Sequence, residues 1–237
     1  MNINEKQFRR VMVGTPTIDG KLDVWYVQAL LETVKLCAVN EVAVLPLFIA
    51  YDSLVQRARN DLITAAYDAQ VDDLIFIDAD IEWHPQDFLK LLSHNVDMVG
   101  GTYRKKNNQE EYVLRVPENN IPNIQVNASG IAEVSGLGTG FLRLSKRCYS
   151  ILCENSTEYT NGGKKARMVF DISIVDGELH SEDISMCDKW LKSGEKIWFD
   201  PTITCNHVGI QKFTGNFVEW YNRVFKPSVM DNGSEIL

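Results

Sequence analysis

The feature that most constrains this chain is residues 73–85, where a short apolar run ends in two aspartates. Leu74 to Ile77 form the run, and three of its four residues are β-branched or aromatic, which favours a buried strand. Asp78 and Asp80 follow the run, and Pro85 fits the first position of a helix. The pattern predicts a strand, a loop and a helix of an α/β protein.

The place of Asp78 and Asp80 predicts their chemistry. Ligands of open α/β sheets bind just outside the carboxyl ends of the strands. Two carboxylates there repel each other unless a positive charge lies between them, and a divalent cation commonly supplies it. An Asp-x-Asp arises by chance about once in a chain of this length, so the expectation depends on the flanking strand and helix.

The length and composition fit a single globular domain. The 237 residues can bury a sizeable core as one α/β domain or two small ones, and 45% of them are hydrophobic. The net charge of −8 argues against a nucleic-acid partner, because neutralising phosphates needs clustered Lys and Arg.

The apolar stretches and the cysteines indicate the compartment that we expect. The apolar stretch from Val42 to Tyr51 contains Pro46 and is too short for a membrane span, and residues 1–5 contain no apolar signal core. The five cysteines are odd in number and lack C-x-x-C spacing. We therefore expect reduced thiols, no zinc site, no membrane span and a cytoplasmic protein.

Periodicity and breaker residues predict alternating strands and helices. Strands are expected at 11–15, 42–49, 74–77 and 96–99 and from residue 196 onward, and residues 136–144 are a Gly-rich entry to a further strand. Helices are expected at 23–39, 52–67 and 85–95, with another opening at Ser181. Residues 107–130 should form loops with one or two edge strands, and residues 154–168 a mobile polar loop.

Several polar residues at element ends are candidate ligand contacts, each with a structural alternative. Thr15 follows the first strand, and its loop either contacts a ligand or simply turns. Arg57 and Arg59 lie about 100° to either side of the apolar stripe of their helix, so they cannot point the same way. Arg57 has Asp61 at i+4, an ordinary exposed pair, whereas Arg59 either faces solvent or binds a ligand.

Later segments raise the same choice. The Gly100-Gly101 pair permits a tight turn or a close approach to a ligand, and Gly138-Thr139-Gly140 lacks the spacing of a P-loop. Helix capping by Ser181 would by itself account for Glu182 and Asp183. His207, taken alone, is more often structural than a metal ligand.

Taken together, the pieces resemble the GT-A-fold glycosyltransferases that use nucleotide sugars and carry an Asp-x-Asp motif. The matching pieces, in order, are Arg57-Ala58-Arg59-Asn60, Asp78-Ala79-Asp80, Gly100-Gly101-Thr102-Tyr103, Gly138-Thr139-Gly140, Ser181-Glu182-Asp183 and His207. The resemblance implies one GT-A-like, Rossmann-like domain over residues 1–209, with a mixed, mainly parallel sheet between helices. Residues 210–237 would form an aromatic, helical tail that packs on the domain or on a partner and ends in disorder.

The resemblance also implies the activity and its cofactor. A sugar would pass from a nucleoside diphosphate sugar, a UDP-sugar by preference, to a hydroxyl of a carbohydrate acceptor. A Mn²⁺ or Mg²⁺ ion held by Asp78, Asp80 and His207 would stabilise the charge on the leaving diphosphate. Asp80 is the firmer ligand, and Asp78 either binds the metal or contacts the ribose.

The remaining roles follow from the same resemblance. Thr15 and Pro16 would border the nucleotide base, and Arg59 would contact the diphosphate or the sugar of the donor. Gly101, Gly138 and Thr139 would line the donor site. Asp183, beside Glu182, matches the general base of inverting members, whereas in retaining members the same position grips a sugar.

Two other classes remain open. A phosphohydrolase of the haloacid-dehalogenase type would use the first Asp as nucleophile and the second as acid and base, but that family carries the motif on its first strand. A non-catalytic, metal-dependent nucleotide- or sugar-binding module is the third reading, because capping is sufficient to explain Asp183.

Overall fold

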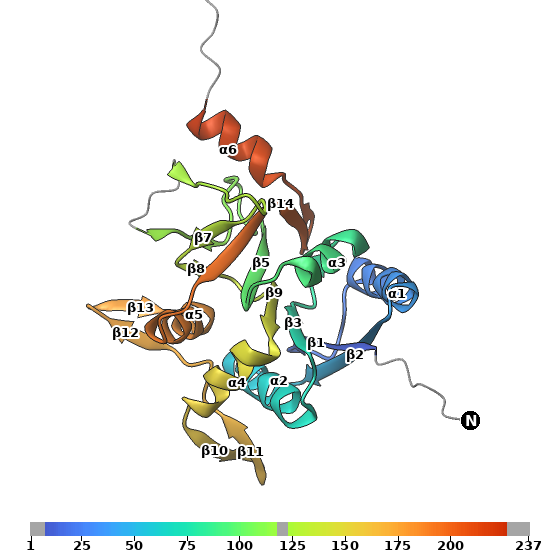
Figure 1. Cartoon of the computed structure of the whole chain (residues 1–237), viewed down its shortest axis with the longest axis vertical. Helices are drawn as coiled ribbons and strands as arrows, with labels where there is room; N and C mark the ends of the chain where they lie inside the picture. The colour runs from blue at the N-terminus through green and yellow to red at the C-terminus, as the bar shows by residue number, and fades with distance from the viewer. Residues whose placement is uncertain (1–7, 118–122, 227–237) are drawn as a thin grey trace, which may run out of the picture.

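The computed structural model describes residues 8–117 and 123–226 and has a curled mixed sheet between two layers of helices (Figure 1). The sheet order is β15-β14-β5-β9-β3-β1-β2. The strands on this path are β1 (Arg9–Thr17), β2 (Val42–Ala50), β3 (Asp73–Ile77), β5 (Met98–Tyr103), β9 (Phe141–Ser145), β14 (Ile197–Val208) and β15 (Lys212–Phe213). Because β9 is antiparallel to both β3 and β5, strands β1, β2, β3, β5 and β14 all point the same way.

Side-chain caps satisfy free amides at the start of three of the described helices. The helix bounds are α1 (Val24–Val39), α2 (Val55–Ala69), α3 (Pro85–Ser93), α4 (Lys146–Glu154), α5 (Glu182–Lys192) and α6 (Phe217–Phe225). The Asp23 side chain accepts from the amide of Trp25, and Ser145 does the same for Cys148. Pro85 occupies the first turn of α3, as its fixed φ favours.

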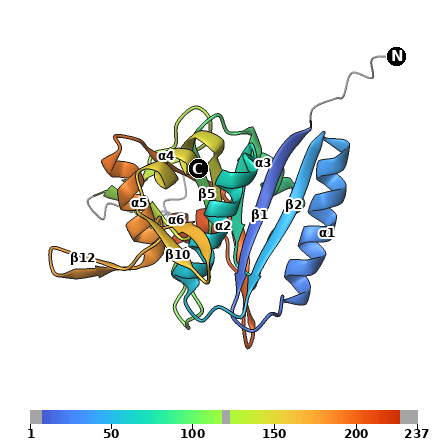
Figure 2. The same cartoon turned by 90° about the horizontal axis from the view of Figure 1, so that it is seen from below.

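Alternating side chains of the central strands feed two apolar cores, one on each face of the sheet. Leu74 and Phe76 of β3 join the core beneath α2, α4 and α5. Ile75 and Ile77 point the other way, into the core beneath α1 and α3. Figure 2 shows α1 and α2 on opposite sides of β1 and β2. All four residues are fully buried, so the predicted strand lies at the centre of the fold.

Short strands and hairpins decorate the sheet. They are β4 (Ile81–Glu82), β6 (Leu114–Arg115), β7 (Ala132–Val134), β8 (Gly136–Leu137), β10 (Glu158–Asn161), β11 (Lys164–Arg167), β12 (Ser173–Val175) and β13 (Glu178–His180). The expectation of a loop over residues 154–168 is wrong, because β10 and β11 pair as a hairpin that bonds to α2. The amide of Arg167 donates to Thr64 Oγ1 at 3.0 Å.

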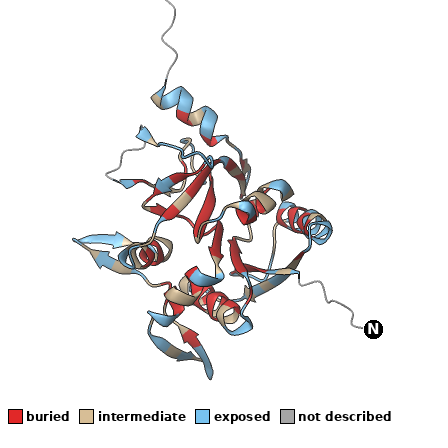
Figure 3. Cartoon of the chain, in the orientation of Figure 1, coloured by how far each residue is buried: buried red, intermediate tan, exposed pale blue. Residues whose placement is uncertain are grey.

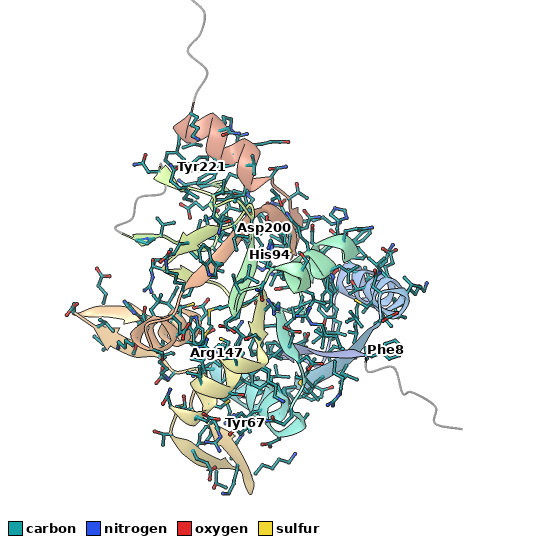
Figure 4. All side chains as sticks on the ribbon, viewed as in Figure 1. Phe8, Tyr67, His94, Arg147, Asp200 and Tyr221 are labelled. Atoms are coloured by element: carbon teal, nitrogen blue, oxygen red, sulfur yellow. The ribbon has the colours of Figure 1, made fainter. Side chains whose placement is uncertain are left out.

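The strand boundaries near Gly101 and Asp200 also differ from expectation. Gly100 and Gly101 lie inside β5, and a Cβ on Gly101 would stand 2.3 Å from a side-chain carbon of Ile203. The strand expected from residue 196 runs to Val208 as β14, with a register shift against β5 between Phe199 and Thr204. At that shift the buried Asp200 carboxylate accepts from Lys90 at 2.8 Å and lies 2.9 Å from His94 Nε2 (Figure 4).

The tail helix α6 packs on the domain. The Phe217 ring lies 4.9 Å from that of Phe199 and 5.4 Å from that of Tyr112, centroid to centroid. The expected disordered end falls in residues 227–237, outside the described part. All five cysteines are buried and unpaired. Among the helices that the structure describes, none has the length and apolarity needed to cross a bilayer.

Candidate functional site

A cavity of about 610 Å³ opens at the carboxyl edge of the parallel strands. Its walls come from the segments that follow β1, β2, β3 and β5 and from the end of β14. Its lining residues include Pro16, Arg59, Asp78, Asp80, Lys106 and His207. Since the carboxyl ends of parallel strands meet at one edge, residues far apart in sequence converge here.

Backbone hydrogen bonds fix the turn that carries the two aspartates. The amide of Asp78 donates to the carbonyl of Gly140 at 3.3 Å, which ties the turn to the start of β9. The amide of Val208 donates to the carbonyl of Asp80 at 2.8 Å, which ties it to β14. The turn is therefore held on both sides, and the two carboxylates leave it from a rigid base.

Asp78 belongs to an ion-pair triad around the buried Arg59, which we call the inner half of the site and define as Arg59, Asp78 and Glu182. Arg59 Nη2 lies 2.9 Å from Asp78 Oδ1, and Arg59 Nη1 also pairs with Glu182. Only 5% of Arg59 is exposed. Burial works against its charge, but Asp78 and Glu182 outweigh burial and raise the guanidinium pKa above its ordinary value.

Asp80 faces the cavity in the outer half of the site, defined as Asp80, Lys106 and His207. Its carboxylate pairs with the ammonium of Lys106, and its Oδ1 lies 3.5 Å from His207 Nε2. Burial raises the pKa of Asp80, but the hydrogen bonds and charges of His207 and Lys106 win and hold that pKa below its ordinary value. Asp80 is thus an ionised carboxylate at the cavity wall.

The hydrogen bond at the back of His207 fixes which ring nitrogen is available. Nδ1 lies 3.0 Å from the backbone carbonyl oxygen of Arg104. Since a carbonyl oxygen can only accept, Nδ1 carries the proton. Nε2 therefore donates to Asp80 only when the ring is an imidazolium, and in the neutral ring Nε2 holds the lone pair that a cation would take. Metal-binding histidines in proteins are commonly oriented by such a bond.

The fit of these residues to a divalent cation is partial. Within residues 8–117 and 123–226, no three His, Cys, Asp or Glu side chains stand close enough together to hold a metal. The reason is that Asp78 is turned to Arg59. Asp80 and His207 alone suit a cation that takes its remaining ligands from substrate phosphates and water, as Mg²⁺ commonly does.

Four of the residues expected at a donor site lie behind the cavity wall. Thr15 is fully buried and its hydroxyl bonds that of Tyr26 at 2.6 Å. Gly101 and Gly138 are closely packed: a Cβ on Gly138 would lie 2.4 Å from Tyr103 Oη. Thr139 is fully buried, and its hydroxyl has no hydrogen-bond partner among the described residues. Pro16 does line the cavity.

Glu182 and Asp183 diverge in the first turn of α5. Glu182 reaches Arg59, whereas Asp183 Oδ1 accepts from the amide of Ile184 at 2.8 Å and from the Ser181 hydroxyl. Ser181 does occupy the cap position, but its side chain bonds Asp183 and makes no capping bond to the backbone. Asp183 does not line the cavity.

Lys106 is the site residue that sequence reasoning missed. It belongs to Arg104-Lys105-Lys106, which follows β5. The available signal was its position: a basic residue just beyond a strand whose carboxyl end shares the edge with Asp80.

Comparisons with known proteins identify the fold and leave the activity open. No protein-family model matches the chain, and no curated protein matches it. Among solved structures the chain is similar to A197 from STIV, with a TM-score of 0.51, 14% identity, and 85% of this chain and 86% of that chain covered. At that identity the similarity concerns the fold, so a mixed α/β sheet with flanking helices is what these two proteins share.

Proposed function

We propose that this protein is a metal-dependent glycosyltransferase that moves a sugar from a nucleoside diphosphate sugar, a UDP-sugar by preference, to a hydroxyl of a carbohydrate acceptor. The observation that carries the proposal is the convergence of Asp80 and His207 Nε2 on one cavity at the carboxyl edge of the sheet. The volume of about 610 Å³ suits a small-molecule ligand.

The residues of the outer half would hold the charged part of the donor. A Mn²⁺ or Mg²⁺ ion bound at Asp80 and His207 would stabilise the negative charge that develops on the leaving diphosphate. Lys106 lies at the same cavity wall, and its ammonium would pair with a phosphate once Lys106 has moved away from Asp80. Pro16 borders the same cavity and would contact the nucleotide base of the donor.

The inner half has a different part in the proposal. Arg59 is buried between Asp78 and Glu182, so we assign it to holding Asp78 in place and not to gripping the donor. Glu182 forms an ion pair with Arg59. Of the two acids Glu182 and Asp183, Asp183 is therefore the one that would contact the acceptor or the sugar. The described residues show no ion pair for Asp183 that would compete with this role.

Isothermal titration of UDP into the full chain, with and without Mn²⁺, tests the proposal directly. Binding should require the metal, and Asp80→Ala should lose both metal-supported binding and donor turnover while retaining the fold. Glu133→Gln, a surface change in β7 whose partner is Lys196, should leave binding unchanged. Metal-independent binding, or none, would overturn the proposal.

A binding module without catalysis is the second candidate, favoured because Asp183 is not among the residues that line the cavity. Release of free sugar from UDP-sugars in the presence of Mn²⁺ separates the two. The haloacid-dehalogenase alternative is less favoured, because β1 and β2 both precede the strand that carries Asp78.

A further inference from the structure

Helix α1 carries an exposed apolar strip along one flank, beside its polar outer face. Exposed residues include Val24 at 68%, Val27 at 37%, Leu31 at 57% and Val34 at 37%, followed by the exposed Ala38. In its sixteen residues α1 carries two charged side chains, Glu32 and Lys35. A surface helix ordinarily has one apolar stripe, which faces its own core, and a second, exposed apolar strip is typical of a helix that packs against two neighbours.

The spacing of these residues indicates what kind of surface they fit. The intervals along Val24, Val27, Leu31, Val34 and Ala38 are three, four, three and four residues, which is the a and d pattern of a helix–helix seam. The face that α1 turns to its own sheet is a separate set: Tyr26, Ala29, Leu30, Thr33 and Cys37. The outer seam is therefore a second packing surface and does not belong to the core.

The position of α1 leaves this seam accessible. Figure 2 shows α1 as the outermost element beside β2, and Figure 3 shows the side of α1 that faces away from the sheet as exposed. Strand β2 lies at the end of the sheet path and contains Pro46, which has no amide to donate and so hinders pairing with another strand. The helix, and not the strand edge, is the surface suited to a partner.

We propose that a second copy of this chain packs its α1 against this one, seam to seam, about a two-fold axis. Two-fold dimers use the same patch on both copies, so that patch must not repel itself. The residues beside the seam, Gln28, Glu32 and Lys35, carry no net charge. In an antiparallel pair Gln28 and Lys35 occupy equivalent flanking positions and face each other across the seam.

The charge of the chain argues against the other occupant that an apolar helix face suits. Helices that lie on anionic membranes carry Lys and Arg along their polar side. Helix α1 has Lys35 alone of these residues, in a chain whose net charge is −8. The dimer does not depend on the glycosyltransferase proposal, and its test measures mass, so the two can fail separately.

Sedimentation equilibrium of the full chain tests the dimer. The wild type should sediment as a dimer, and Leu31→Glu as a monomer with an unchanged circular dichroism spectrum, because Leu31 is 57% exposed and outside the core. Leu179→Glu is the matched control: Leu179 is an exposed leucine of β13, far from α1, and this variant should remain dimeric.

A mixing experiment sharpens the result. Leu31→Glu and Leu31→Lys should each be monomeric alone and form a dimer when mixed, since opposite charges then meet across the seam. A monomeric wild type, or a Leu31→Glu variant that stays dimeric, would overturn the proposal. So would a monomeric wild type that floats with anionic lipid vesicles, because that result assigns the seam to a membrane.

Discussion

Asp78 and Asp80 are two residues apart in one rigid turn, yet they have different partners and different exposure. The Asp78 side chain is 23% exposed and pairs with Arg59, whose own side chain is 7% exposed. The Asp80 side chain is 42% exposed and pairs with Lys106, whose side chain is 33% exposed. The cation of the inner half comes from a packed helix, and that of the outer half from a loop.

This difference in exposure gives the two halves different roles: the inner half stabilises the fold, and the outer half can exchange its cation. Arg59 cannot leave Asp78 without leaving its own buried charge and two partly buried carboxylates unpaired, so the inner half holds α2, the β3 turn and α5 together. Lys106 can swing into solvent at small cost, because exposed ion pairs contribute little. The outer half is therefore the part of the site where a bound metal ion can replace the Lys106 ammonium beside Asp80.

Removal of the buried cation should have the largest effect on stability. We expect Arg59→Met to lower the free energy of unfolding by about 3 kcal/mol, since Asp78 and Glu182 would lose their partner. Urea denaturation measures this. Arg57→Met is the control on the same helix: its partner is Asp52, its side chain is 39% exposed, and the loss should be clearly smaller. Equal losses would remove the distinction between the two sites.

Exchanging each aspartate for its amide should separate the two halves. Asp80→Asn should weaken Mn²⁺-dependent UDP binding by at least about tenfold, with little change in unfolding free energy, because it removes a ligand charge at an exposed site. Asp78→Asn should instead cost about 2 kcal/mol of stability, since Arg59 would keep an uncompensated charge. Calorimetry measures UDP binding and urea denaturation measures stability for both variants. Equal changes in the two variants would contradict the distinction between the inner and outer halves.

Release of the loop cation should have a smaller effect, of opposite sign. Lys106→Gln should raise the affinity for Mn²⁺ without nucleotide by a few-fold, because the ammonium competes with the ion for Asp80. Lys105→Gln provides the control, since Lys105 pairs with Glu111 at 3.2 Å and not with Asp80. An unchanged affinity for Mn²⁺ in Lys106→Gln would show that Lys106 does not compete with the ion for Asp80.

Local patterns were sufficient to predict much of the fold and one part of the site. The apolar run before Asp78, the cap at Asp23 and Pro85 at a helix start are all short-range signals, and β3, α1 and α3 lie where they indicated. Helical geometry also predicted that Arg57 and Arg59 point apart, which is confirmed: Arg57 faces Asp52 and Arg59 the interior.

What could not be predicted depends on contacts between distant residues. Arg59 and Glu182 are separated by 123 positions, and their pairing requires α2 and α5 to pack on the same face of the sheet. Gly101 was expected in a turn or close to a ligand because a Gly-Gly pair permits either, but its small size is required by Ile203 on β14. Lys106 lies in a loop whose path no local pattern fixes.

The smallest expected effect is the pH dependence of the outer pair. The pKa of Asp80 is lowered in the folded chain, so its carboxylate contributes stability that is fully present above the ordinary Asp pKa of about 4 and disappears as the pH falls through the lower folded value. At about pH 7, with metal chelated, the wild type should exceed Asp80→Asn by less than about 0.5 kcal/mol, since the side chain is 42% exposed. Urea denaturation at decreasing pH should bring the two proteins together. A difference that grows in acid would mean that Lys106 and His207 do not hold this carboxylate in its charged form.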